Sequence, residues 1–167
     1  MIKLKNIIFF VFLLLSQWTM GQMPYYKSLY IYHFIKRIEW PKTSEQSQFL
    51  IAVVGDKDTY EALVLISKNK KISNLPLRVV YSEDATDLKS ANLIYVDYSM
   101  RKSLKHLSNN ISQKPILLVS DDKDSPLVDI CLIERSEELN FIVHPKKIRL
   151  KGLKINTDLI QLGIQKE

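Results

Sequence analysis

FLIAVV, residues 49–54, is the stretch that decides the predicted fold, together with the turn-forming pair Gly55 and Asp56 that follows it. A short apolar run bounded by turn residues is typical of a strand that is buried on both faces. Residues 59–68 come next and carry apolar side chains at helical spacing. A strand followed by a helix is the unit from which parallel sheets are built.

The same alternation continues outward from this stretch in both directions. Four strands alternate with helices, whereas the last two strands are joined only by a charged turn at 134–138 and should pair antiparallel. The sequence therefore predicts an α/β fold: a single layered domain, a mostly parallel central sheet, helices on both faces and a C-terminal antiparallel strand pair. Strands are expected at 49–54, 77–81, 93–96, 115–119, 130–133 and 139–143, and helices at 25–38, 59–68, 98–107, 145–150 and 157–162, with a helical turn or two at 84–90.

The first 21 residues have the pattern of a secretory signal peptide. Lys3 and Lys5 precede an unbroken apolar run at 7–15, and small side chains at Thr19 and Gly21 form a cleavage signal. The run is shorter than the roughly 20 apolar residues of a membrane span, and no Cys follows it that would make a lipoprotein anchor. We expect cleavage after Gly21, leaving residues 22–167 as one exported, periplasmic domain; retention as an uncleaved anchor is the alternative.

Composition restricts the chemistry further. The chain has four glycines and none of the clustered glycines that cradle phosphates, so no nucleotide cofactor is expected. The formal charge is +6, but the densest basic group alternates with apolar residues and is interpreted as a solvated helix face, not as a nucleic-acid site. Weak attraction to an anionic membrane surface stays open. That basic group is Lys146, Lys147, Arg149, Lys151 and Lys154.

Cysteine and histidine offer no local metal site. Cys131, the single cysteine, lies in a doubly apolar strand and is interpreted as a small buried hydrophobe. His33 and His106 should be solvated, whereas His144 follows a strand, where ligand sites are often found. The acidic loop 121–129 lacks the glycine and the glutamate of a calcium loop. Ser120 lacks the glycine elbow of a nucleophile, and no catalytic residue, cofactor or metal ligand is predicted.

Asp56 and Asp58 follow the first predicted strand, Asp97 ends the third and Ser120 ends the fourth, where phosphorelay receivers have acidic and hydroxyl residues. No lysine ends the next strand, and an exported domain would lack the phosphohistidine donor. The similarity is therefore interpreted as shared architecture, which does not establish function.

Several short blocks along the chain form a recognisable set. Residues 30–34 and 38–41 form an aromatic segment with an acidic-Trp-Pro ending, and residues 51–56 form an apolar strand with a Gly-Asp turn. These blocks resemble the opening helix and the first strand of the YfiR/HmsC-like family of exported proteins. The blocks at 91–96, 115–121, 141–143, 152–155 and 159–162 resemble its later strands and closing helix. The resemblance implies a non-enzymatic periplasmic repressor of a membrane diguanylate cyclase, YfiN, which an outer-membrane protein, YfiB, relieves. The implied output is cyclic-di-GMP signalling and biofilm formation.

Two main functional hypotheses follow, and a third, an enzymatic role, ranks behind them because the sequence shows no activated nucleophile or metal set. In the first, the protein binds the periplasmic part of an inner-membrane diguanylate cyclase or another membrane sensor, with an outer-membrane lipoprotein and a second copy of the chain as further candidate partners. The partner-binding candidates are Trp40, Phe141, Ile155 and Leu159, although each of them taken singly is better explained as a core residue. In the second, a small-molecule sensor serves a sensor kinase or transport system through a crevice at the strand ends. The crevice candidates are Gly55, Asp56, Asp97, Ser120 and Asp121.

Overall fold

A computed structural model describes residues 22–41, 46–86, 88–135 and 138–166. The predicted signal peptide, residues 1–21, lies outside these residues. No helix in the described part of the chain has the length and apolarity that a membrane span requires. The elements are α2 (Gln22–Lys36), β1 (Ile38–Glu39), β2 (Phe49–Val54), α3 (Lys57–Ser67), β3 (Lys71–Ile72), β4 (Leu75–Ser82), β5 (Leu93–Val96), the 3₁₀-helix η2 (Tyr98–Ser103), α4 (Leu104–Ile111), β6 (Leu117–Ser120), β7 (Ile130–Arg135), β8 (Glu138–Val143), α5 (Pro145–Leu150), β9 (Lys154–Ile155), α6 (Thr157–Leu162) and β10 (Ile164–Gln165).

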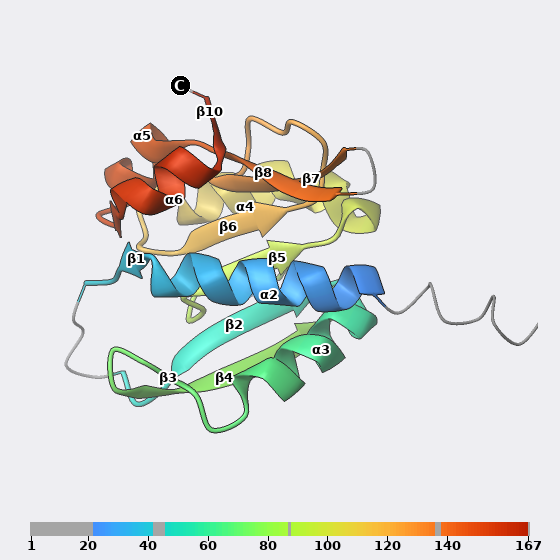
Figure 1. Ribbon diagram of the computed structural model, residues 1–167, viewed down its shortest axis with the longest axis vertical. Coiled ribbons are helices and arrows are strands. Elements are labelled where there is room, and N and C mark those ends of the chain that lie inside the picture. Colours follow the sequence, from blue (N-terminus) through green and yellow to red (C-terminus); the bar gives the residue numbers. More distant parts are fainter. Residues whose placement is uncertain (1–21, 42–45, 87, 136–137, 167) are drawn as a thin grey trace, which may run out of the picture.

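An eight-stranded sheet in the order β10-β8-β7-β6-β5-β2-β4-β3 runs through the molecule (Figure 1). Strands β4, β2, β5, β6 and β7 are parallel neighbours. Strands β7 and β8 form the predicted antiparallel pair, with Cys131 opposite Ile142. The predicted α/β fold with a mostly parallel sheet is confirmed.

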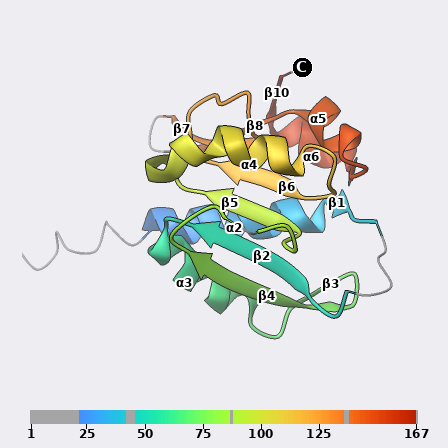
Figure 2. The ribbon, with the colours of Figure 1, turned by 180° about the vertical axis from the view of Figure 1, so that it is seen from behind.

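Helices cover both faces of this sheet. Helices α2, α3 and α6 lie on the face toward the viewer in Figure 1, and α4 lies on the opposite face, which Figure 2 shows. Successive side chains of β2 point to opposite faces of the sheet, so this strand contributes to the hydrophobic core on each face. Ile51 and Val53 pack in the core beneath α2, and Ala52 and Val54 pack in the core beneath α4. All four are fully buried, which is why the strand reads as a continuous apolar run.

Three predicted helices differ in detail. The first helix ends at Lys36 rather than Ile38, because Ile38 pairs with Ile155 in the small antiparallel sheet β1-β9. The predicted helix 98–107 divides into η2 and α4. No helix forms among the described residues of 84–90; the Asp84 carboxylate instead accepts the Thr86 amide at 2.9 Å in a local turn.

The interpretation of the basic group as uniformly solvated is wrong for Lys151. Lys146, Arg149 and Lys154 are exposed, but Lys151 is buried. Its ammonium lies 2.5 Å from Asp129 Oδ2 and donates to the Ile116 carbonyl at 3.1 Å. A buried lysine requires such a partner, and the sequence pattern alone did not pair these residues.

Candidate functional site

The carboxyl ends of β2, β5 and β6 form one edge of the sheet, and the crevice candidates lie there. The chain passes from β2 to β4 on one side and then to β5 on the other, so the strand order reverses between β2 and β5. In doubly wound sheets ligands bind outside the strand ends at such a reversal. Gly55 turns the chain after β2 with φ of +83°, and a Cβ there would lie 2.5 Å from Met100 Cγ. Glycine is therefore required at this turn.

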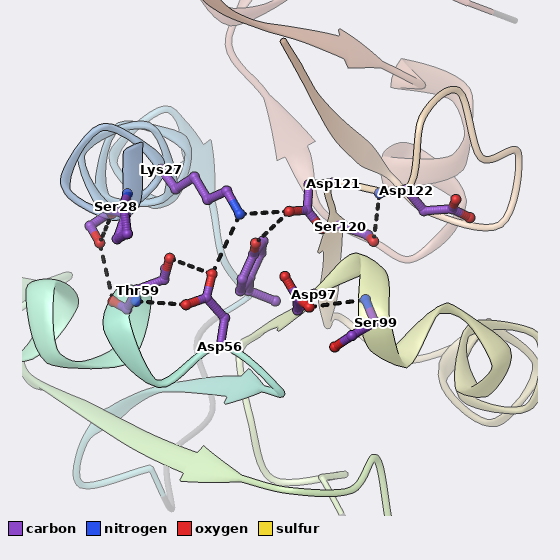
Figure 3. Close-up of polar contacts among 11 residues, drawn as sticks. Lys27, Ser28, Asp56, Thr59, Asp97, Ser99, Ser120, Asp121 and Asp122 are labelled. Atoms are coloured by element: carbon purple, nitrogen blue, oxygen red, sulfur yellow. Dashed lines mark hydrogen bonds and ion pairs between the residues drawn. The ribbon is translucent and has the colours of Figure 1, made fainter. Parts of the chain in front are cut away.

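Lys27 of α2 reaches into this edge and joins residues from two strand ends (Figure 3). Its ammonium lies 2.6 Å from Asp121 Oδ2 and 3.4 Å from Asp56 Oδ2. It also lies 5.8 Å from the centroid of the Tyr95 ring, a cation–π distance. The crevice predicted from the sequence is thus filled in part by the protein's own cation.

Asp56 also caps α3. Its Oδ1 accepts the Thr59 amide at 2.9 Å, and its Oδ2 accepts the Thr59 hydroxyl at 2.7 Å. An aspartate at this position satisfies an otherwise unpaired amide of the first helical turn. The Ser28 hydroxyl of α2 lies 3.1 Å from the Thr59 carbonyl, so α2 contacts the start of α3 twice.

The other crevice candidates have local roles. Asp97 accepts the Ser99 amide at 2.9 Å and caps η2, and Ser120 is fully buried and accepts the Asp122 amide at 3.1 Å. The structure therefore connects Asp56 and Asp121 through Lys27, while Gly55, Asp97 and Ser120 shape the same edge without direct contact to the ammonium.

The electrostatics of the cluster favour a charged lysine. Burial lowers the pKa of Lys27, but Asp121, Asp56 and Asp97 together outweigh burial and hold that pKa above its ordinary value. The buried Tyr95 hydroxyl donates to Asp121 Oδ2 at 3.1 Å, and burial followed by the nearby carboxylates raises the pKa of Tyr95 well above 10.0. Asp121 Oδ1 is buried and has no hydrogen-bond partner among the described residues.

Sequence reasoning missed Lys27, although one signal was available. Lys27 precedes Ile31 and Ile35 by one and two helical turns, so it belongs to the buried stripe of α2. A lysine on an apolar stripe needs a carboxylate partner in the fold. Because Lys27 comes from a helix, the spacing of residues along the strands could not reveal it.

The partner-binding candidates fall in two places. Phe141 and Leu159 line a groove of about 310 Å³ between α2 and α6, together with Tyr30, His33, Phe34, Arg37 and Leu162. Phe141 packs edge-on against Phe34 at 5.0 Å between ring centroids, and both Phe141 and Leu159 are largely buried. A Cβ on Gly163 would lie 2.4 Å from the Phe141 ring, so this glycine allows the ring to form the groove floor.

Trp40 and Ile155 lie away from this groove. Trp40 donates its indole N–H to the Ile35 carbonyl at 3.2 Å and packs edge-on against Phe49 at 4.9 Å. Ile155 pairs with Ile38, and both Trp40 and Ile155 are half-buried against the core beneath α2. The structure therefore brings together Phe141 and Leu159 but not all four candidates.

The two residues that the sequence left most uncertain are both buried. The Cys131 thiol donates to the Asp122 carbonyl at 2.7 Å, and burial raises the pKa of this thiol, which suits a structural role. His144 precedes α5, and its Nε2 is buried without a partner among the described residues. Burial, followed by the charge of Lys147, lowers the pKa of His144 despite Asp129 and Asp124.

The fold is a doubly wound α/β domain, with a polar crevice at the strand ends and an apolar groove beside α2. A comparison with family models makes this more specific. The YfiR/HmsC-like family model matches residues 25–164, and the chain belongs to that family. No curated protein matches the chain.

Proposed function

We propose that this protein is an exported, non-enzymatic regulator that binds the periplasmic part of a membrane signalling protein. Membership of the YfiR/HmsC-like family supports this role. By the family resemblance, the partner is a membrane diguanylate cyclase that the protein represses, thereby lowering cyclic-di-GMP and limiting biofilm. Residues 1–21 act as the cleaved signal peptide that delivers residues 22–167 to the periplasm.

The observation that carries the proposal is the groove between α2 and α6. Its walls are apolar and aromatic, and it is also lined by the Arg37 guanidinium and by the His33 imidazole, whose Nδ1 lies 3.1 Å from Arg37 Nη1. Leu162 lines this groove and is 66 % exposed. An exposed leucine beside buried aromatic rings, with a polar rim, has the composition of a protein-binding surface.

A matched pair of exposed leucines tests the groove. Leu65 of α3 is 76 % exposed and does not line the groove, so Leu65→Glu is the control for Leu162→Glu. We expect Leu162→Glu to raise cyclic-di-GMP and biofilm to the level of a deletion strain, with unchanged protein level and melting temperature. Leu65→Glu should regulate normally. Equal regulation by both variants would exclude the groove, and a deletion strain with unchanged cyclic-di-GMP would exclude control of a cyclase.

The second candidate function is a small-molecule sensor that uses the crevice at the strand ends. The open cleft beside Asp121, whose Oδ1 lacks a hydrogen-bond partner among the described residues, favours it. The two functions make different demands on the chain: the first depends on Leu162 and the second on Asp121. A ligand that binds the crevice and changes regulation would combine them.

A further inference from the structure

A cleft continues outward from the Lys27 cluster, between the first half of α2 and the β7–β8 hairpin. It consists of two adjoining hollows of about 570 and 840 Å³, which share Met23, Glu134 and Leu139. The inner hollow reaches Lys27 and Asp121, and the outer one reaches Tyr26 and Glu138. The cleft therefore joins the partly buried ion pair at the strand ends to the protein surface.

The cleft is acidic, whereas the chain as a whole carries a formal charge of +6. Asp121 and Asp122 line the inner hollow, Glu138 lines the outer one, and Glu134 lines both. Only Lys27 and Lys123 oppose these four carboxylates in the lining, and Lys27 is already held by Asp121 and Asp56. The electrostatic field in the cleft therefore favours a cationic ligand.

The structure already shows how an ammonium group binds here. The Lys27 ammonium has a carboxylate oxygen of Asp121 at 2.6 Å and the ring of the buried Tyr95 at 5.8 Å. Carboxylates and aromatic rings together are the usual surroundings of bound organic ammonium groups. The described residues contain no group of three His, Cys, Asp or Glu side chains placed to hold a metal ion. An organic cation therefore suits these carboxylates better than a metal.

The walls of the cleft suit an aliphatic stem. Met23, Leu132 and Leu139 supply apolar surface beside the carboxylates. Tyr26 is 46 % exposed at the outer end, and no cation lies over its ring among the described residues. A lysine side chain, four methylenes ending in an ammonium, is the ligand that the fold itself places at the inner end.

We propose that this cleft is a binding site for small aliphatic amines, whose ammonium competes with that of Lys27 for Asp121. A second ammonium, as in an aliphatic diamine, would be held by Glu134 or Glu138 at the outer end. Lys27 is a tethered competitor at high effective concentration, so it weakens the binding of free amines and closes the site against them. Amine binding would release α2 from the strand ends.

Removal of the competitor provides the test. We expect n-butylamine to stabilise Lys27→Ala against heat at concentrations at least about tenfold lower than it needs with the wild-type protein, because the tethered ammonium no longer competes. The uncharged n-butanol, of similar size, should have no such effect. Asp121→Asn added to Lys27→Ala should abolish the response to the amine. Equal responses of all three proteins, or equal effects of amine and alcohol, would overturn the proposal.

A second measurement needs no change at Lys27. Titration of 1,4-diaminobutane into the wild-type protein should show saturable binding, and Glu134→Gln together with Glu138→Gln should weaken it severalfold while Glu61→Gln on α3 should not. Absence of binding to the wild type and to Lys27→Ala alike would refute the site. These experiments use the isolated protein, so their failure would leave the proposed repressor role intact, just as normal regulation by Leu162→Glu would leave the amine site intact.

Discussion

Two lysine–aspartate pairs anchor helices to opposite ends of the parallel strands, and they differ in what surrounds them. Lys27 and Asp121 meet at the carboxyl ends, with side chains 15 % and 17 % exposed. Lys151 and Asp129 meet where β6 and β7 begin, with side chains 7 % and 1 % exposed. The first pair borders an open cleft, whereas the second is sealed within the protein.

The hydrogen bonds also distinguish the two pairs: the sealed pair has additional backbone partners, whereas one oxygen of the cleft pair has none among the described residues. Asp129 Oδ2 accepts both Lys151 and the Leu118 amide, at 2.7 Å from the latter, and Lys151 also donates to the Ile116 carbonyl. Asp121 keeps one oxygen without a partner among the described residues. The contrast teaches that one chemical pair serves two purposes: the sealed pair fixes the loop before β7, and the cleft pair is accessible to competition.

The largest effect should come from breaking the sealed pair. Lys151→Met leaves the Asp129 carboxylate buried without its cation, so the free energy of unfolding should fall by about 3–5 kcal/mol in urea denaturation. Lys151→Met combined with Asp129→Leu should recover part of this loss, because no uncompensated charge then remains. A loss below about 1 kcal/mol for the single variant would contradict the sealed character of this pair.

A smaller loss is expected at the cleft. Lys27→Met should lower the free energy of unfolding by about 1–2 kcal/mol, because water entering the cleft can solvate Asp121 in part. Lys123→Met, in the lining of the same cleft but outside the ion pair, should change stability by less than about 0.5 kcal/mol. If Lys27→Met cost as much as Lys151→Met, the distinction between the two ends of the sheet would fail.

The free energy of unfolding should also depend on pH through His144, whose backbone amide donates to the Asp129 carbonyl of the sealed pair. The pKa of His144 is lowered in the folded protein, so the unfolded chain binds the extra proton as pH falls through about 6.5. Stability should therefore decrease from pH 7 to pH 5, by at most about 1.4 kcal/mol per pH unit for one proton. His144→Gln should flatten this slope in denaturation curves at several pH values. An unchanged slope would assign it to other groups.

The smallest effect on stability is expected from an ion pair that lies at neither end of the parallel strands and is exposed to solvent. Lys154 and Glu39, on the small β1-β9 sheet, lie 3.7 Å apart with side chains 83 % and 79 % exposed. Glu39→Gln should change the free energy of unfolding by less than about 0.5 kcal/mol, and added salt should remove the difference. A larger effect in thermal unfolding would show that exposure alone does not rank these pairs.

The fold was predictable because its signals are local. The doubly buried strands at 49–54 and 93–96 were predicted with the bounds that the structure has, since apolar runs between turn residues need no knowledge of distant contacts. The end of α2 was less predictable, because Ile38 pairs in the small β1-β9 sheet with Ile155, which lies more than a hundred residues later in the sequence. Helix ends depend on such partners as well as on local preference.

The candidate site was predictable only in part. Aspartates at strand ends were expected to share one edge, because parallel strands end together, and Asp56 and Asp121 do so. The lysine between them was not, since it comes from a helix that precedes the whole sheet in sequence. Likewise, Phe141 and Leu159 were named as partner-binding candidates, but only the packing of α6 against α2 places them in one groove.

The sequence by itself determined the order of the main strands and helices and the resemblance to an exported regulatory family. These properties rest on local periodicity and on short apolar blocks, which one chain displays without folding. The tertiary structure alone decided which lysine meets which aspartate. Charge pairing depends on distances of a few ångströms between segments far apart in sequence, and burial then makes Lys151 a structural anchor and leaves Lys27 beside an open cleft.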